Sequence, residues 1–335
     1  MNQWIEIDDR SAVAVVRRLA RRLGSDIGLS EVRLDELAIV ASEATTNILR
    51  YATRGRALID VTRTADAVRV VMIFTDRGPG IGDVDRMFQD GESSTDSAGL
   101  GLGAIRRLSD TFDIFSSAEN GTTIACSFMA EGAALDCGVD AVGLRVCHPN
   151  ETVCGDDYLL QQSRRATHIL LCDGLGHGAE AAKASDEVMR AAGEAGISAA
   201  PGGIMEQVTE ALVGKRGAVA AILQIAQPEM VMSYAGLGNI STLWISAEST
   251  KRMAVRDGRI GARTTRGYEE TGELSAGDMI IMHSDGLKTL REAHIPPGLL
   301  KKTPLLIAGF FLDRAFRGRD DASIVVARIT REPER

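Results

Sequence analysis

Three short segments in the first third of the chain carry residue types that suit a nucleotide. They are the pair Glu43 and Asn47, the glycine turn Asp76-Arg77-Gly78-Pro79-Gly80, and the series Gly99, Gly101 and Gly103. No lysine occurs before Lys183, whereas a Walker-type phosphate loop requires one. A nucleotide site in this half would therefore use backbone amides, an acid and a metal ion.

Glu43 and Asn47 are spaced four residues apart, which places both side chains on one face of a helix. An asparagine oxygen is a suitable ligand for Mg²⁺, which needs few protein oxygens when it also binds phosphates. A glutamate beside it is placed to accept the proton of an attacking hydroxyl. The pair therefore predicts Asn47 as a metal and cofactor ligand and Glu43 as a catalytic base.

The glycine turn follows an apolar strand and predicts the base-binding end of the site. Asp76 ends that strand, where its carboxylate would accept a hydrogen bond from an exocyclic amine. Gly78 and Gly80 would let the following loop turn tightly and approach a base.

The series Gly99, Gly101 and Gly103 is expected just before a helix, so that free amides face phosphates, with Arg106 one turn further on. Taken singly, each of these segments is as typical of a structural role, either an ordinary turn or solvent-facing polar residues, as it is of a site. Their combination, in this order and in strand and helix contexts, favours a site.

A second group of aspartates flanks apolar strands in the other half of the chain. They are Asp156 and Asp157 after Gly155, Asp173 before Gly174, Asp285 before Gly286, and the pair Asp320 and Asp321. Carboxylates converging from distant strand ends form a hard-oxygen site for Mn²⁺ or Mg²⁺, and two such ions activate water for phosphoester hydrolysis. A single Asp-Gly is more typical of a turn, but four such segments favour a metal site. No cysteine or histidine cluster is expected to compete for zinc.

The elements that would position the first site follow from hydrophobic periodicity. Helices are expected over residues 11–24, 31–52 and 104–109, and strands over 57–63, 68–75, 112–116 and 122–128. Gly24 is a natural end for the first helix. The apolar run Val70–Phe74 predicts a sheet covered on one side by helices.

The pattern becomes richer in strands beyond a boundary near residues 130–134. Strands are expected over 141–147, 157–162, 167–172, 219–225, 230–235, 242–245, 279–283 and 323–329, and helices over 179–195, 204–213 and 299–316. The chain of 335 residues is long enough for two cores. We therefore expect two domains, residues 1–132 and 135–331.

Composition narrows the class of protein. The formal net charge of −8, from 38 basic and 46 acidic residues without a basic stripe, disfavours nucleic-acid binding. No apolar run approaches the roughly 18 residues of a membrane span, and the first residues lack signal-peptide features. Five cysteines without a Cys-x-x-Cys pair argue against a disulfide or zinc framework. A cytoplasmic protein is expected.

The first set of motifs resembles the N, G1 and G2 boxes of the GHKL ATPase/kinase fold. More narrowly, residues 42–52, 76–90 and 99–114 resemble the anti-sigma-factor serine kinases, RsbT-type switch kinases above all, over about residues 5–129. The resemblance implies an α/β sandwich in which Asn47 holds Mg²⁺, Glu43 is the base and Asp76 reads the adenine of ATP. It also implies that the substrate is a serine or threonine of a STAS-domain antagonist protein.

The second set resembles the PPM (PP2C-type) phosphatases of the SpoIIE/RsbX branch over about residues 137–330. The similar segments are Gly155–Tyr158, Asp173–Gly178, Ala235–Asn239, Ser284–Leu287 and Asp320–Ser323. The resemblance implies an α-β-β-α sandwich and two ions of Mn²⁺ or Mg²⁺. The implied ligands are Asp156, Asp173, the Gly174 carbonyl, Asp285 and Asp320, and the choice within each Asp-Asp pair stays open.

Together the two resemblances predict a partner-switching regulator that phosphorylates and dephosphorylates a STAS-domain antagonist, with a sigma factor or a downstream phosphatase as a further partner. Two alternatives stay open. In one, the first half binds ATP without catalysis and sequesters a sigma factor or antagonist; in the other, it only senses nucleotide for the phosphatase. Glu43 beside Asn47 favours catalysis.

Overall fold

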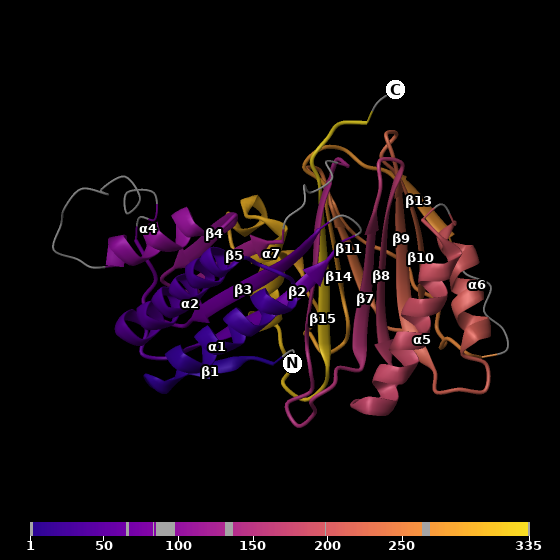
Figure 1. Cartoon of the computed structure of the whole chain (residues 1–335). Helices are drawn as coiled ribbons and strands as arrows, with labels where there is room; N and C mark the ends of the chain where they lie inside the picture. The colour runs from indigo at the N-terminus through magenta and orange to yellow at the C-terminus, as the bar shows by residue number, and fades with distance from the viewer. Residues whose placement is uncertain are drawn as a thin grey trace.

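A computed structural model describes residues 3–64, 67–82, 84, 98–130, 137–197, 199–262 and 269–333. The predicted domain boundary at 132 to 135 lies outside the described residues, so the exact limits stay a prediction. The molecule is a mixed α/β structure built on three five-stranded sheets (Figure 1).

The first sheet is antiparallel and is made from residues before 130. Its strands, in spatial order, are β1 (Ile5–Ile7), β2 (Gly55–Arg63), β3 (Val68–Asp76), β5 (Gly121–Met129) and β4 (Thr111–Ser117). Helices α1 (Ser11–Asp26), α2 (Glu31–Tyr51) and α4 (Ala98–Leu108) cover one face. The expected helices and strands of this half are thus present, and β1 is an addition.

Helix α1 continues two residues past Gly24, the glycine that was expected to end it. Gly24 packs against the next helix instead, because a Cβ there would lie 2.7 Å from Leu34 Cδ2. Helix α2 begins at an extended Ser30, whose hydroxyl accepts from the Arg33 amide at 3.4 Å. Close packing of α1 on α2 therefore explains why a glycine occupies position 24.

Residues beyond 137 form two antiparallel sheets stacked face to face. One contains β13 (Glu269–Glu273), β10 (Val231–Leu237), β9 (Ala218–Ala226), β8 (Ala166–Gly174) and β7 (Asp156–Gln162). The other contains β12 (Thr250–Arg252), β11 (Ser241–Ile245), β14 (Met279–His283), β15 (Ala322–Ile329) and β6 (Val139–Val146). Their facing side chains form one core, which includes Tyr234, Ile280 and Val325.

Helices complete an α-β-β-α sandwich in this half. Helices α5 (Ala179–Ala195) and α6 (Pro201–Ala211) cover the outer face of the β7–β10 sheet. Helix α7 (Pro304–Arg314) covers the outer face of the other sheet. Short 3₁₀ turns, Glu292–His294 and Leu299–Lys301, precede it. The helix expected over 299–316 is therefore shorter, because Thr303 caps a new helix that starts at Pro304.

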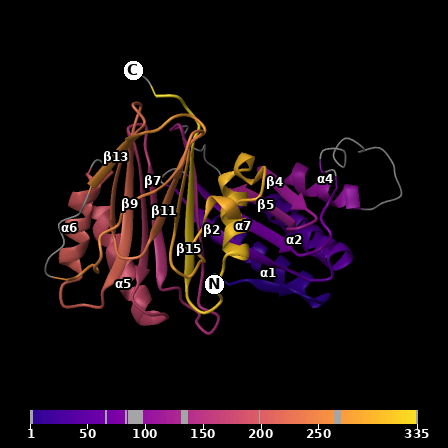
Figure 2. The same ribbon diagram turned by 180° about the vertical axis from the view of Figure 1, so that it is seen from behind.

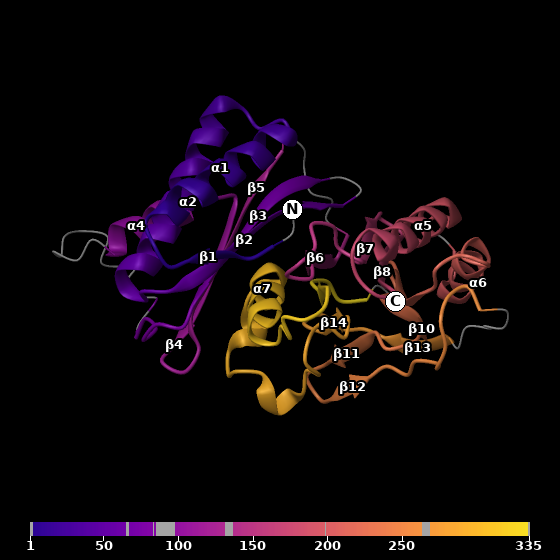
Figure 3. The same ribbon diagram turned by 90° about the horizontal axis from the view of Figure 1, so that it is seen from below.

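Helix α7 also covers the second face of the first sheet, as the views from behind and from below show (Figures 2 and 3). Leu58, Val71 and Ile73 of the first sheet share one buried cluster with Leu306 and Phe310 of α7. Phe310 meets Phe115 edge-on, with ring centroids 5.5 Å apart. The first sheet is thus covered on both sides, not on the single side expected from its sequence.

Candidate functional sites

A cavity of about 300 Å³ opens between α2, the glycine turn and the first sheet. Most of its lining is apolar, with Ile48, Phe74 and Ile124 on its walls, and Asn47 and Asp76 are its main polar side chains. Such a cavity, mostly apolar with a few placed polar groups, is typical of small-ligand sites. Its shape and lining suit the ring system of a nucleotide base.

The Asp76 carboxylate is held by the backbone around the cavity. Its Oδ1 accepts from the Gly78 amide at 2.8 Å and from the Thr122 amide at 3.2 Å. No residue in the described part of the chain donates to Oδ2, which is left to accept from a ligand. Burial raises the pKa of Asp76 above its usual value. Gly80 has a φ of 73°, and a Cβ there would lie 2.5 Å from the Ser117 carbonyl, so the turn requires glycine.

Glu43 and Gly101 lie beside Asn47, which lines the cavity. A Cβ at Gly101 would lie 2.9 Å from Glu43 Oε2 and 3.3 Å from either terminal atom of Asn47. The Asn47 amide nitrogen is buried, and no described residue accepts its hydrogen bond. A buried unpaired amide is rare in a finished core, so the part of the cavity beside Asn47 is suited to a polar ligand.

The glycine series was expected just before the helix. Instead, Gly99, Gly101 and Gly103 lie inside α4. The helix begins at Ala98, six residues earlier than expected, because packing on α2 outweighs the low helix propensity of glycine. The amides of the first turn, which include that of Gly99, still lack intrahelical acceptors. Arg106 is exposed on α4, and its contact to phosphate stays a prediction.

Strand pairing brings the predicted aspartates together at one edge of the stacked sheets. Asp156 is the first residue of β7 and pairs in register with Asp173 on β8. Asp285 follows β14, and Asp320 precedes the neighbouring strand β15. Gly174 ends β8 against α5, where a Cβ would lie 2.3 Å from the Ala181 carbonyl, and its carbonyl as a ligand stays a prediction.

The electrostatics of this cluster fit a divalent cation. Burial, followed by the carboxylates of Asp156 and Asp285, raises the pKa of Asp173 far above its usual range. Burial also raises the pKa of Asp156, although Ser323 donates to its Oδ2 at 2.6 Å. Carboxylates gathered in this way repel one another, and oxygen donors of this kind suit Mg²⁺ or Mn²⁺.

Hydrogen bonds distinguish the members of the two Asp-Asp pairs. Both oxygens of Asp321 are used by the backbone, accepting from the His148 amide at 2.7 Å and the Gly155 amide at 3.0 Å. Asp157 forms an ion pair with Arg145 at 2.5 Å. Asp157 and Asp321 are thus both paired within the protein, and the choice of Asp156 and Asp320 as ligands stays a prediction.

One thiol cluster was not expected from the spacing of the cysteines. Cys147, Cys154 and Asp321 place their sulfur and oxygen atoms within 4.8 Å of one another, because the 148–153 loop folds back. Asp321 is already hydrogen-bonded, and the hydrogen bond with Cys147 and burial raise the pKa of Cys154 well above its usual value. The two thiols therefore pack against the Asp321 carboxylate and are not suited to binding zinc. His177 stacks on His148, with ring centroids 4.4 Å apart.

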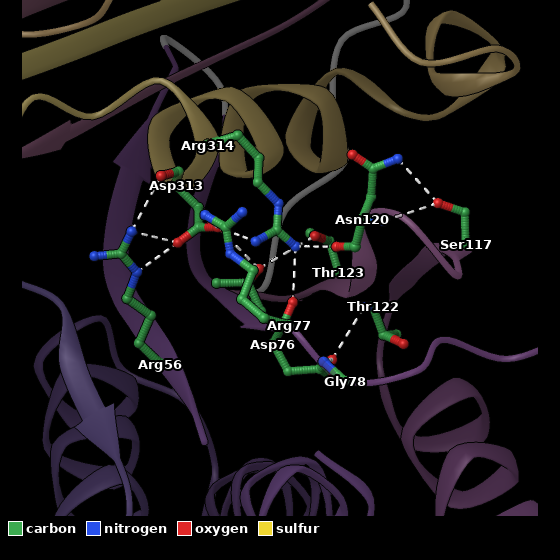
Figure 4. Close-up of polar contacts among 11 residues, drawn as sticks. Arg56, Asp76, Arg77, Gly78, Ser117, Asn120, Thr122, Thr123, Asp313 and Arg314 are labelled. Carbon is green, nitrogen blue, oxygen red and sulfur yellow. Dashed lines mark hydrogen bonds and ion pairs between the residues drawn. The ribbon is translucent and has the colours of Figure 1, made fainter. Parts of the chain in front are cut away.

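Sequence analysis missed the residues that join the two halves beside Asp76. Arg314, at the end of α7, donates from Nη2 to the Asp76 carbonyl at 2.7 Å and to the Asn120 carbonyl (Figure 4). Asp313 accepts from Thr75 at 3.2 Å and pairs with Arg56. The signal for this junction was the α7 sequence, which is apolar all round, as is typical of a helix buried on every side.

Comparison with family models matches two families along the chain. Residues 7–128 match the histidine kinase-like ATPase domain, and residues 163–306 match stage II sporulation protein E (SpoIIE). The second match contains Asp173 and Asp285, whereas Asp156 and Asp320 lie outside it.

Two curated proteins of Bacillus subtilis (strain 168) match separate halves. Serine/threonine-protein kinase RsbT is 31% identical over 112 residues, which cover 33% of this chain and 84% of RsbT. Phosphoserine phosphatase RsbX is 28% identical over 143 residues, which cover 41% of this chain and 69% of RsbX.

Among solved structures, one described as "The bacterial stressosome: a modular system that has been adapted to control secondary messenger signaling" matches at 25% identity and a TM-score of 0.52. It covers 57% of this chain and 99% of its own. RsbX in complex with magnesium matches at 21% identity and a TM-score of 0.50, over 57% of this chain and 96% of its own, which supports the fold. No helix in the described part is long and apolar enough to cross a membrane.

Proposed function

Because the chain belongs to the RsbT-like histidine kinase-like ATPase family and carries a SpoIIE-type PP2C phosphatase domain in the same polypeptide, we propose that it is a bifunctional partner-switching regulator. Its first half phosphorylates a serine or threonine of a STAS-domain antagonist protein with ATP. Its second half removes that phosphate. The antagonist in turn controls a sigma factor or a downstream phosphatase.

The observation that carries the kinase proposal is that Glu43 and Gly101 lie beside Asn47, which lines a cavity large enough for a nucleotide base. Asp76 Oδ2 accepts a hydrogen bond from the exocyclic amine of adenine, and the side-chain oxygen of Asn47 binds Mg²⁺. Glu43 holds the position from which a carboxylate accepts the proton of the incoming hydroxyl. A module that only binds ATP has no need of an acid beside Asn47.

The phosphatase proposal depends on the carboxylate cluster. Asp156, Asp173, Asp285 and Asp320, with the Gly174 carbonyl, would hold Mg²⁺ or Mn²⁺, which supply an activated water for phosphoester hydrolysis. Asn239 donates to Asp285 Oδ2 at 2.7 Å and orients that carboxylate. Ser323 and Ser284 do the same for Asp156. The buried repulsion within the cluster is the property that a cation would relieve.

Radiolabelled ATP, the full chain and candidate STAS proteins test both activities together. Glu43→Gln should retain ATP binding and lose phosphotransfer by about 10²- to 10⁴-fold. Asp173→Asn should remove Mn²⁺-dependent dephosphorylation and raise the steady-state phosphorylation of the STAS protein. Glu36→Gln, on the same helix as Glu43 but ion-paired with Arg33, is the matched control and should behave as wild type.

The result also separates the alternatives. Normal phosphotransfer by Glu43→Gln would show that Glu43 is not the base. ATP binding without phosphotransfer in wild type would favour a nucleotide-sensing or sequestering module. Steady-state phosphorylation unchanged by Asp173→Asn would mean that the two halves act on different proteins.

A further inference from the structure

The end of helix α7 lies against the backbone of two loops at the base-binding cavity. The Asp76 carbonyl lies on the turn that carries the adenine-facing carboxylate, and the Asn120 carbonyl lies two residues before Thr122, which also lines the cavity. Arg314 donates from the same Nη2 to both carbonyls (Figure 4). One guanidinium group from the phosphatase half therefore joins two loops of the nucleotide half.

The Asp76 carbonyl is enclosed on its other side. Gly121 has a φ of 64°, and a Cβ there would lie 2.3 Å from the Asp76 oxygen. The carbonyl is therefore confined between the Gly121 backbone and the Arg314 guanidinium. Because the Asp76 carboxylate extends from the same residue, movement of this carbonyl would move the carboxylate that faces the cavity.

Arg314 is itself buried and ion-paired, although its Nε and Nη1 find no hydrogen-bond acceptor among the described residues. Its side chain is 10% exposed, and Nη1 pairs with Asp313 Oδ2 at 2.9 Å. Burial lowers the pKa of Arg314 to about 10, so the group stays charged at neutral pH. Asp313 is fixed in turn by Arg56 and by Thr75. A charged donor held in place by buried partners is suited to positioning a loop.

We infer that Arg314 is a positioning residue of the ATP site, contributed by the phosphatase half, which holds the Asp76 turn in the geometry that recognises adenine. The inference depends on the proposed binding of ATP at this cavity. It makes base recognition in the first half a property of the joined chain. Arg314 touches the base end only, so its effect should depend on the base and not on the number of phosphates.

Calorimetry of the full-length chain with ATP, ADP and GTP, each with Mg²⁺, tests this inference. Arg314→Gln should weaken ATP binding about ten- to hundredfold, the range for loss of a hydrogen bond from a charged group. ADP binding should weaken by the same factor, and the preference for ATP over GTP should fall. Arg314→Lys keeps a charged donor and should recover part of the affinity.

Arg328→Gln is the matched control, because Arg328 also donates from one Nη2 to two carbonyls, those of Leu300 and Lys302, and neither residue lines the cavity. It should leave ATP affinity unchanged. Circular dichroism checks that each variant is folded at the temperature used. If Arg314→Gln is not folded, the comparison is made with Arg314→Lys.

Three results would contradict the inference. They are ATP affinity unchanged in the Arg314 variants, equal weakening by Arg328→Gln, or a loss of affinity with the ATP-to-GTP ratio preserved. Absence of ATP binding in wild type would instead contradict the proposed function itself.

Discussion

A single methyl group at Gly309 tests whether α7 packs on the first sheet as the structure shows. Gly309 lies in the middle of α7 and faces Ile73 of β3, and a Cβ there would lie 2.7 Å from Ile73 Cδ1 and Cγ2. Ile73 is fully buried, and its branched side chain has few alternative rotamers. Gly309→Ala should therefore force α7 and β3 apart.

Two opposing terms set the magnitude. Replacing an interior helical glycine with alanine stabilises a helix by about 1 kcal/mol. Overpacking a dense core costs about 1 to 3 kcal/mol. We expect Gly309→Ala to lower the free energy of unfolding by about 1 kcal/mol. Gly193→Ala in α5, where a Cβ meets nothing within 4 Å, should raise it by about 0.5 to 1 kcal/mol.

Urea unfolding followed by the fluorescence of Trp4 measures both variants. Trp4 packs against the cluster that contains Ile73 and residues of α7. The chain has two tryptophans, so both variants are made in a Trp244→Phe background, in which the fluorescence comes from Trp4. In an Ile73→Ala background, where the obstructing atoms are gone, Gly309→Ala should change sign and stabilise. If Gly309→Ala alone stabilises the chain as much as Gly193→Ala does, α7 does not contact Ile73 and the junction is wrong.

Three further outcomes are expected. Asp173→Asn removes a repulsion between carboxylates, so the metal-free variant should have a higher melting temperature than wild type at pH 7. The variant should also lose the increase in melting temperature that Mn²⁺ gives wild type, and an unchanged Mn²⁺ response would count against the site. Burial raises the pKa of Asp60 to about 6. Because its pKa is raised in the folded state, this carboxyl contributes stability to the fold below about pH 4, and the contribution is lost as the pH rises through 6. Asp60→Asn should therefore gain about 2 kcal/mol on wild type between pH 4 and 7 in urea titrations, and parallel pH profiles would refute this. A Cβ at Gly286 would lie 1.8 Å from the Asp321 carbonyl, so Gly286→Ala should abolish Mn²⁺-dependent hydrolysis of an aryl phosphate while ATP binding measured by calorimetry is retained.

Local patterns were sufficient to predict most elements and the composition of both sites. The spacing of Glu43 and Asn47 placed them on one helix face, and alternation or apolar runs located the long strands. The start of α4 was predicted too late, because glycine propensity was weighed without the packing of α4 on α2. Short, polar edge strands such as β13 (Glu269–Glu273) were missed, since their burial pattern alternates without a large apolar side chain.

The junction between the halves was beyond local patterns. Val70 to Phe74 are all buried, and a continuous apolar run of this kind is typical of a strand covered on both faces. The second cover comes from α7, more than 200 residues further along the chain. Hydrophobic periodicity shows that a face must be buried but does not identify the segment that buries it.

The double cover of the first sheet has a practical consequence for dissecting the chain. A fragment that ends near residue 130 would expose Leu58, Val71 and Ile73 to water, and a fragment that begins near 137 would expose the facing side of α7. Apolar surfaces of this extent drive self-association. Expression of either half alone would therefore favour aggregates or new dimers, and replacing Val71 and Phe310 with polar residues would be the first step towards soluble fragments.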